Sequence, residues 1–270
     1  HPAIAKAAII IAEEELEEDL EEVYKDIVRG TAETRVEIPV TPFAEVLHCA
    51  PILLTTLPEL GIPFDRAKGI AIAVADEAER AGEDSDFLVF TVTRAKTYRE
   101  AGDNIGATQI LRLAIPTALA RRDWSSMGRS YINELAVCEG KIGNPLISFW
   151  LGGLSVLDIK TVDSISRERA KISLASMGSV CNKHTVLYGE ELYAKTLRAV
   201  VMLGMPIAPD NRTQRNFQQY KKRADELGIV TCDFNTAFEW LEDAMRITFE
   251  RITDSEILKL TERLGITYPK

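Results

Sequence analysis

The amino-acid sequence predicts an all-α protein with two helical lobes and at most one short strand or hairpin. Apolar residues recur at spacings of three and four over most of the 270 residues, as they do in amphipathic helices. Glycine and proline separate these stretches, at positions where helices commonly end. Only the short segment "TRVEIPV", 34–40, alternates like a strand, and Pro39 restricts it to a sheet edge or an extended linker.

The first element, 3–29, is expected to be one long amphipathic helix that ends at Gly30. Its acidic face includes "EEELEEDLEE", 13–22, in which eight residues are Asp or Glu. Such a helix needs tertiary or quaternary contacts to persist, so we expect it to dock on its own subunit or to act as an exchange arm on a neighbouring one. Its apolar stripe consists of Ile9, Leu16, Leu20, Val23, Tyr24, Ile27 and Val28.

Four further helices are expected before residue 125. Proline should break the first of them at Pro51 and kink the last at Pro116. The third is ambiguous, because "FLVFTVT" has the composition of a strand while the preceding "DSD" is a good helix cap, and we favour a helix. The four segments are 41–61, 63–82, 83–102 and 104–124.

The second half is expected to be helical throughout, with turns at glycine and proline. In the fifth of its helices, four residues fall on one face and are expected in the core: Phe217, Tyr220, Ala224 and Leu227. The expected helices cover 125–138, 145–157, 163–180, 189–204, 211–227, 233–250 and 254–264.

Charge is segregated along the chain, although the formal net charge is only -9. Residues 1–120 hold 11 basic and 22 acidic residues, whereas residues 121–223 hold 16 basic and 9 acidic ones. The fold either mixes these charges again or uses the basic middle to line the path of a polyanion. We predict an acidic amphipathic helix over 1–30, an N-terminal helical lobe over 31–125 and a C-terminal helical lobe with a basic face over 126–270.

The segment "NRTQRNFQQYKKR", 211–223, carries five positive charges and no negative one. One basic helix face is ordinarily a solvated surface, but three other predicted helices also present two or more cations each. A nucleic-acid backbone needs cations distributed in this way, because each phosphate contact adds a modest, salt-sensitive increment. The predicted nucleic-acid-binding residues are Arg121, Arg122, Arg129, Arg167, Lys171, Lys183, Lys195, Arg198, Arg212, Arg215 and Lys222.

Motifs for catalysis are absent from the sequence. No serine-hydrolase elbow, zinc-protease motif or phosphate-binding loop occurs, and "MGSVCNK", 177–183, is interpreted as a turn. The best metal set is His48 and Cys49 with Cys181 and His184, but adjacent helix residues point about 100° apart and chelate poorly. The four dispersed cysteines are expected to be buried, reduced thiols. We predict no catalytic residue, no cofactor and no bound metal.

These observations predict a non-enzymatic, self-associating RNA-coating protein, such as a helical nucleoprotein or coat subunit of a virus. Its partners are single-stranded nucleic acid, with RNA favoured, and further copies joined through the N-terminal helix. No apolar run reaches the roughly 18 residues that a membrane span needs, so we expect no membrane partner and a cytoplasmic location, or the virion if the protein is viral. Two alternatives stay open: a helical enzyme with an unrecognised cleft, and an adaptor whose acidic N-terminal helix binds a basic partner.

Overall fold

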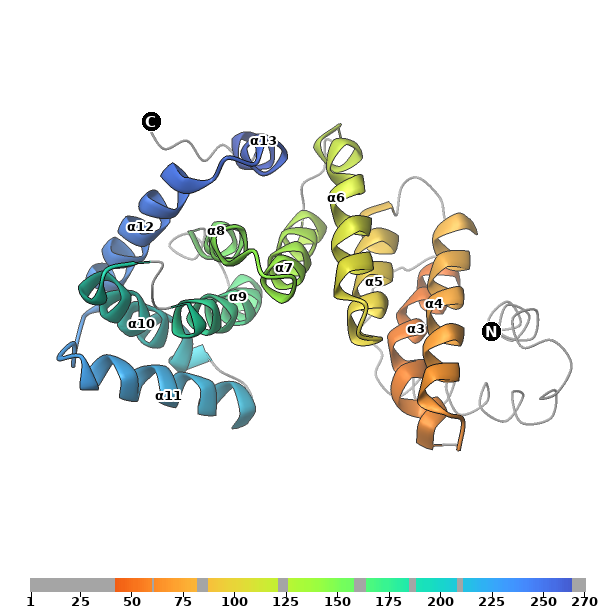
Figure 1. Ribbon diagram of the computed structural model, residues 1–270, viewed down its shortest axis with the longest axis horizontal. Helices are drawn as coiled ribbons and strands as arrows, with labels where there is room; N and C mark the ends of the chain where they lie inside the picture. The colour runs from red at the N-terminus through yellow and green to blue at the C-terminus, as the bar shows by residue number, and fades with distance from the viewer. Residues whose placement is uncertain are drawn as a thin grey trace, which may run out of the picture. The chain divides into compact units, whose positions relative to one another are not determined.

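The computed structural model describes residues 42–59, 61–81, 87–120, 126–157, 164–184, 188–207 and 211–263. All regular structure within these ranges is helical and no strand occurs in them, which confirms the all-α prediction (Figure 1). The chain forms two compact units, whose boundary lies between Ala114 and Ile115, inside α6 (Asn104–Ala120). The predicted helix over 3–29 and strand over 34–40 lie outside the described residues, and the predicted three-part division stays a prediction.

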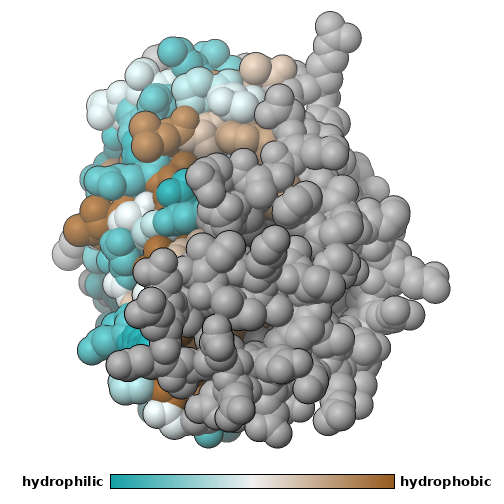
Figure 2. Space-filling view, turned by 90° about the vertical axis from the view of Figure 1, so that its right-hand side faces the viewer, coloured by the Kyte–Doolittle hydropathy of each residue, from teal (hydrophilic) through white to brown (hydrophobic). Residues whose placement is uncertain are grey.

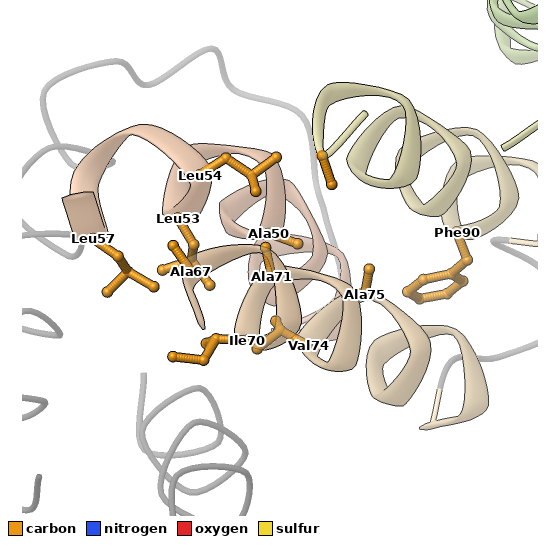
Figure 3. Close-up of a cluster of buried hydrophobic side chains, with 11 residues drawn as sticks. Ala50, Leu53, Leu54, Leu57, Ala67, Ile70, Ala71, Val74, Ala75 and Phe90 are labelled. Atoms are coloured by element: carbon orange, nitrogen blue, oxygen red, sulfur yellow. The ribbon is translucent and has the colours of Figure 1, made fainter. Parts of the chain in front are cut away.

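Three helices build the described core of the first unit: α3 (Pro42–Glu59), α4 (Phe64–Ala81) and α5 (Phe87–Glu100). Each of them contacts the other two. Figure 3 shows the apolar side chains that α3 and α4 direct at each other, with Phe90 of α5 beside them. Small side chains on α4 let the helices approach closely. The labelled cluster consists of Ala50, Leu53, Leu54, Leu57, Ala67, Ile70, Ala71, Val74, Ala75 and Phe90.

The predicted break at Pro51 is wrong, because α3 runs without interruption through Pro51 and Pro58. An interior proline costs a helix about 3 kcal/mol. Three leucines that follow Pro51 are buried in the core, and burying each of them contributes about 1.5–3 kcal/mol. The tertiary contacts of α3 therefore outweigh the local penalty. Helix α6 also continues past Pro116, to Ala120, as the predicted helix over 104–124 does.

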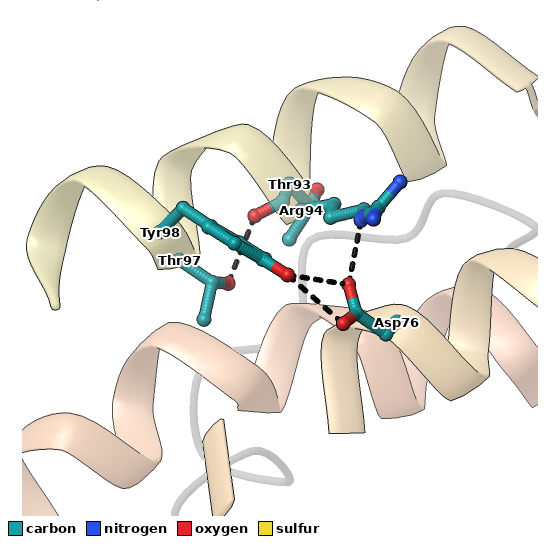
Figure 4. A network of polar contacts seen from close by, with 5 residues as sticks. All are labelled: Asp76, Thr93, Arg94, Thr97 and Tyr98. Atoms are coloured by element: carbon teal, nitrogen blue, oxygen red, sulfur yellow. Dashed lines mark hydrogen bonds and ion pairs between the residues drawn. The ribbon is translucent and has the colours of Figure 1, made fainter. Parts of the chain in front are cut away.

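The ambiguous segment "FLVFTVT" is helical, as favoured, and forms the start of α5. The hydroxyl of Thr97 donates to the backbone carbonyl of Thr93 at 2.9 Å, so a buried threonine is satisfied inside the helix. Asp76 of α4 accepts hydrogen bonds from Arg94 Nε at 2.6 Å and from the Tyr98 hydroxyl at 2.9 Å (Figure 4). Burial and the hydrogen bond to Asp76 raise the pKa of Tyr98. These contacts between helices override the strand propensity of the segment.

Seven helices follow in the second half at the predicted positions, to within a few residues. Two run further than expected: α7 ends at Lys141 and α9 ends at Lys183. The segment "MGSVCNK", 177–183, is therefore the last part of a helix and its interpretation as a turn is wrong. The helices are α7 (Ser126–Lys141), α8 (Pro145–Leu157), α9 (Ser164–Lys183), α10 (Glu190–Gly204), α11 (Asn211–Glu226), α12 (Phe234–Arg251) and α13 (Ser255–Arg263).

Helix α8 lies at the centre of the second unit and contacts α7, α9 and α12. Its Trp150 is fully buried, and the indole Nε1 donates to the hydroxyl of Thr261 in α13 at 2.8 Å. The Trp150 ring also lies 5.0 Å, centroid to centroid, from the ring of Phe249 in α12. One aromatic side chain of α8 thus connects the two C-terminal helices to the core.

Helix α11 packs on α9 and α10 through two glycines, and α10 and α11 run beside each other (Figure 1). A Cβ atom on Gly178 of α9 would lie 2.5 Å from the Tyr220 ring, and one on Gly204 of α10 would overlap with the Phe217 ring. Phe217, Tyr220 and Ala224 are buried as predicted, whereas Leu227 lies just past the end of α11 and is only partly buried. This docking fixes which face of α11 meets solvent.

Exposed hydrophobic side chains are scattered over the described helices. In the part of the surface that Figure 2 colours by hydropathy, hydrophobic residues lie in small groups between hydrophilic ones. Isolated exposed hydrophobic residues are normal and identify no site. The large ones exposed in the described part are Ile52, Phe64, Ile105, Leu113, Ile142, Val230 and Phe234.

Replacing Gly204 by Ala is expected to lower the free energy of unfolding by roughly 1–3 kcal/mol, because the new methyl group overlaps with the buried Phe217 ring. Urea unfolding followed by circular dichroism measures this loss. Gly69→Ala in α4 is the matched control, since a Cβ atom there meets nothing within 4 Å. Alanine should stabilise that helix by up to about 1 kcal/mol. A Gly204→Ala variant as stable as the wild type would contradict the close approach of α10 and α11.

Candidate nucleic-acid interface

The outer face of α11 carries two cations that make no ion pair within the described part of the chain. Arg215 and Lys222 are exposed, and the helical repeat places them opposite the buried Phe217 and Tyr220. Gln219, also exposed, lies between them on the same face. The docking of the apolar face thus presents a polar, positively charged ridge to solvent.

The cations that flank this ridge are paired within α11 itself. Lys221 Nζ lies 3.1 Å from Asp225 Oδ2, and Arg223 Nη1 lies 3.1 Å from Glu226 Oε2. Pairs of this kind at spacings of three and four contribute little to stability, but each cation is neutralised by a carboxylate of the same helix. The two paired cations therefore differ from Arg215 and Lys222, although the sequence alone makes all four look alike.

Arg198 of α10 is buried and joins α10 to α11. Its guanidinium forms an ion pair with Asp225, and its Nε donates to the carbonyl of Ile229 at 2.9 Å. Only 7% of its side chain is exposed. This predicted phosphate ligand therefore has its donors directed at the protein, and we place it in the framework that holds α11.

Both cations that contact Asp225 lower the pKa of its carboxyl group. The hydrogen bond from Lys221 and then the charge of Arg198 hold the pKa of Asp225 below its usual range. A carboxylate with a lowered pKa stabilises the fold above its ordinary pKa of about 3.9, and this stabilisation is lost as the pH falls through the lowered value. The connection between α10 and α11 is thus complete at neutral pH and weakens only in acid.

Two more predicted cations lie in the neighbouring helices α9 and α10. Lys183, the last residue of α9, is exposed and makes no ion pair within the described part. Lys195 of α10 is partly buried; its Nζ lies 2.6 Å from Glu191 Oε1 and 5.8 Å from the centre of the Trp240 ring. The hydrogen bond and charge of Lys195 lower the pKa of Glu191. Of the two, Lys183 is the one free to contact an anion.

The other predicted residues are placed only in part. Arg121 and Arg122 lie outside the described residues. For the rest the helix is described and the side chain is not: Arg129 lies in α7, Arg167 and Lys171 lie in α9, and Arg212 lies in the first turn of α11. Their role stays a prediction.

Sequence reasoning missed Lys141, at the last position of α7. Lys141 is exposed, makes no ion pair within the described residues, and lines the same small pocket as Lys183. The predicted helix ended at residue 138, so Lys141 was assigned to a turn. Its proximity to Lys183 arises from the packing of α7 and α9 on α8, which no local pattern reveals.

The cysteines and histidines show no arrangement for chemistry in the described part. Cys138 and Cys181 are buried free thiols, as expected, and Cys232 is partly buried. Burial raises the pKa of the Cys181 thiol to about 12, which keeps it protonated and unreactive. No three His, Cys, Asp or Glu side chains that the structure describes could jointly hold a metal ion. His48 and Cys49 lie in α3, and their side chains lie outside the described set.

Comparison of the chain with protein-family models, with curated proteins and with solved structures finds no match. The described helices include none with the length and apolar character that crossing a membrane requires. Function is therefore inferred from the charge, exposure and geometry of the residues above.

Replacing Arg198 by Ala is expected to lower the free energy of unfolding by roughly 1.5–3 kcal/mol, because a buried, charge-assisted hydrogen bond to the Ile229 carbonyl is lost. Thermal and urea unfolding at pH 7 measure the change. Lys222→Ala is the control, since an exposed cation without an ion pair should change stability by less than about 0.5 kcal/mol. If both variants unfold alike, Arg198 has no framework role.

Proposed function

We propose that this protein is a non-enzymatic nucleic-acid-coating protein, of the helical nucleoprotein or capsid-subunit type, which binds single-stranded RNA without reading its sequence. In this proposal the RNA backbone follows the outer ends and faces of α9 and α11 in the second unit. We call this the basic surface and define its described part by Lys183, Arg215 and Lys222.

The observation that carries the proposal is the state of these three cations: each is exposed and none pairs with a described carboxylate. A phosphate can approach such a cation without displacing an internal partner. Lys195 and Lys221, in contrast, must first leave Glu191 and Asp225. Each phosphate contact then releases condensed counterions, which makes affinity cumulative and salt-dependent.

Lack of sequence specificity agrees with the kinds of residue involved. Contacts to phosphate fix the position of a strand but carry no sequence information, and no base-reading motif occurs in the sequence. Arg129, Arg167, Lys171 and Arg212, whose helices are described, extend the basic surface in this proposal, as do Arg121 and Arg122. Arg198 is not included, because its donors are engaged inside the unit.

Self-association is the second part of the proposal and rests on the sequence of the N-terminal segment. Residues 3–29 combine an apolar stripe with eight acidic residues among the ten residues 13–22. Like charges at helical spacings destabilise an isolated helix, so such a helix needs a partner surface. An exchange arm on a neighbouring copy supplies one and makes the assembly a homo-oligomer.

The cysteines fit a reducing compartment, in which such an assembly forms. Cys138 and Cys181 are free thiols, fully buried among helices of the second unit. Dispersed free thiols are typical of proteins that fold where disulfides do not persist. We therefore place the protein in the cytoplasm, and in the virion if it is viral.

Replacing Lys183, Arg215 and Lys222 together by Ala is expected to weaken binding of single-stranded RNA without unfolding the protein. The slope of log affinity against log salt should become shallower by about 2, because three phosphate contacts at about 0.7 each are lost. Wild-type affinity should itself fall on the order of 10³-fold between roughly 50 and 200 mM salt. Fluorescence anisotropy with a labelled oligonucleotide measures both quantities.

A charge-matched control separates the basic surface from net charge. Lys68→Ala, Lys96→Ala and Arg246→Ala together remove three cations whose partners are Asp65 at 3.3 Å, Glu100 at 3.9 Å and Asp243 at 3.4 Å. This control should leave the salt slope near the wild-type value. Equal weakening by both triple variants would show that overall charge, not the basic surface, determines binding.

Replacing Leu16, Leu20 and Val23 by Ser in the full chain is expected to reduce the size of the oligomer while leaving its charge unchanged. The apolar stripe of the N-terminal segment loses its hydrophobic contact area, on which its docking depends. Light scattering measures the size, and circular dichroism reports whether the rest stays folded. An unchanged oligomer would contradict the exchange arm, and insoluble aggregate would place the segment in the core of its own subunit.

A further inference from the structure

A small pocket lies where α7, α8 and α9 meet in the second unit. Its volume is about 100 Å³. Six of the nine described residues that line it are polar or positively charged, and no Asp or Glu is among them. The polar lining residues are Lys141, Ser148, Ser176, Ser179, Lys183 and His184.

Ser148 is the unusual member of this lining. The residue is only 2% exposed, and it lines the pocket. A serine hydroxyl at the wall of a pocket can donate a hydrogen bond to an anion that enters it. Gly140 of α7 leaves room for it, because a Cβ atom there would lie 2.7 Å from Ser148 Oγ. The glycine thus keeps the hydroxyl accessible from the pocket.

The mouth of the pocket is positive. Lys141 ends α7, Lys183 ends α9, and both are exposed without an ion pair in the described residues. His184 follows Lys183 and is partly buried. The nearest acid in sequence, Glu139, is fully buried and accepts from the amide of Asn144 at 2.7 Å, so its charge is already engaged. Two ammonium groups and an imidazole therefore line the same pocket as the Ser148 hydroxyl.

This set of donors matches a phosphate group. Lysine ammonium groups and serine hydroxyls all donate to phosphate oxygens, and hydrogen bonds between charged partners are the strongest ones. One water molecule needs roughly 10–15 Å³ of such space, so a pocket of about 100 Å³ has room for a tetrahedral oxyanion. No aromatic side chain is among its lining residues, so it provides no stacking surface.

We propose that the pocket of Lys141, Ser148 and Lys183 binds one phosphate group, which is a backbone phosphate of the single-stranded RNA. This assignment rests on the proposed function and adds a fixed anchor to it. The basic surface attracts the strand through exposed charges, whereas the pocket holds one phosphate by a buried hydroxyl at a defined position. Lys183 belongs to both the basic surface and the pocket, and it marks where the RNA strand enters the pocket.

The test uses inorganic phosphate and an RNA oligonucleotide as separate probes on the full-length protein. Phosphate is titrated at constant ionic strength, and the amide signal of the glycine at 140 is followed by NMR. Ser148→Ala, which removes one hydrogen bond, is expected to weaken phosphate binding by roughly 5- to 10-fold. Lys141→Gln should weaken both phosphate and RNA binding. Lys259→Gln, an exposed lysine of α13 outside the pocket, is the matched control and should change neither.

The outcomes separate the pocket from the wider proposal. If the two pocket variants bind phosphate and RNA as the wild type does, the pocket assignment is overturned and the basic surface stands. If the wild type binds phosphate at the pocket but no RNA, the proposed function fails and the site takes a free phosphate compound. Loss of both ligands in Lys141→Gln and Ser148→Ala, with Lys259→Gln unchanged and all variants folded, supports the assignment.

Discussion

The close approach of α11 to α9 and α10 is the constraint on which the candidate interface depends. Gly178 and Gly204 leave no side chain between the helices, so the Tyr220 and Phe217 rings fill that space. Arg198 then joins α10 to Asp225 of α11 and to the carbonyl of Ile229 beyond it. Aromatic burial sets how deep α11 sits, and the buried ion pair sets its position along α10. The outward direction of Arg215 and Lys222 follows from both.

Electrostatics divides the cations of the second unit into two groups with different roles. Lys195, Arg198, Lys221 and Arg223 meet carboxylates within the unit and hold helices or neutralise local charge. Lys141, Lys183, Arg215 and Lys222 have no such partner among the described residues and face solvent. Net charge hides this division, because the whole chain is acidic. A basic surface on an acidic protein is a local property of the fold.

Helix positions were largely predictable from the sequence, and the limits of that prediction are physical. Periodicity located each described helix, but it placed a break at Pro51, where burial of the following leucines keeps α3 continuous. It also treated Arg198 and Arg215 alike, since a helical repeat shows which face a residue lies on and not what covers that face. Lys141 and Ser148 come together at one pocket only through the packing of α7, α8 and α9. Contacts between distant segments leave no local pattern.

The central claim is that single-stranded RNA lies on the second unit along α9 and α11. Cross-linking the protein to a bound RNA oligonucleotide with formaldehyde, followed by mass spectrometry of the attached peptides, tests it most directly. The account predicts cross-links at Lys183 and Lys222, reduced when salt is raised before the reaction. Cross-links confined to lysines of α4 and α5, or no attachment of RNA at low salt, would contradict it.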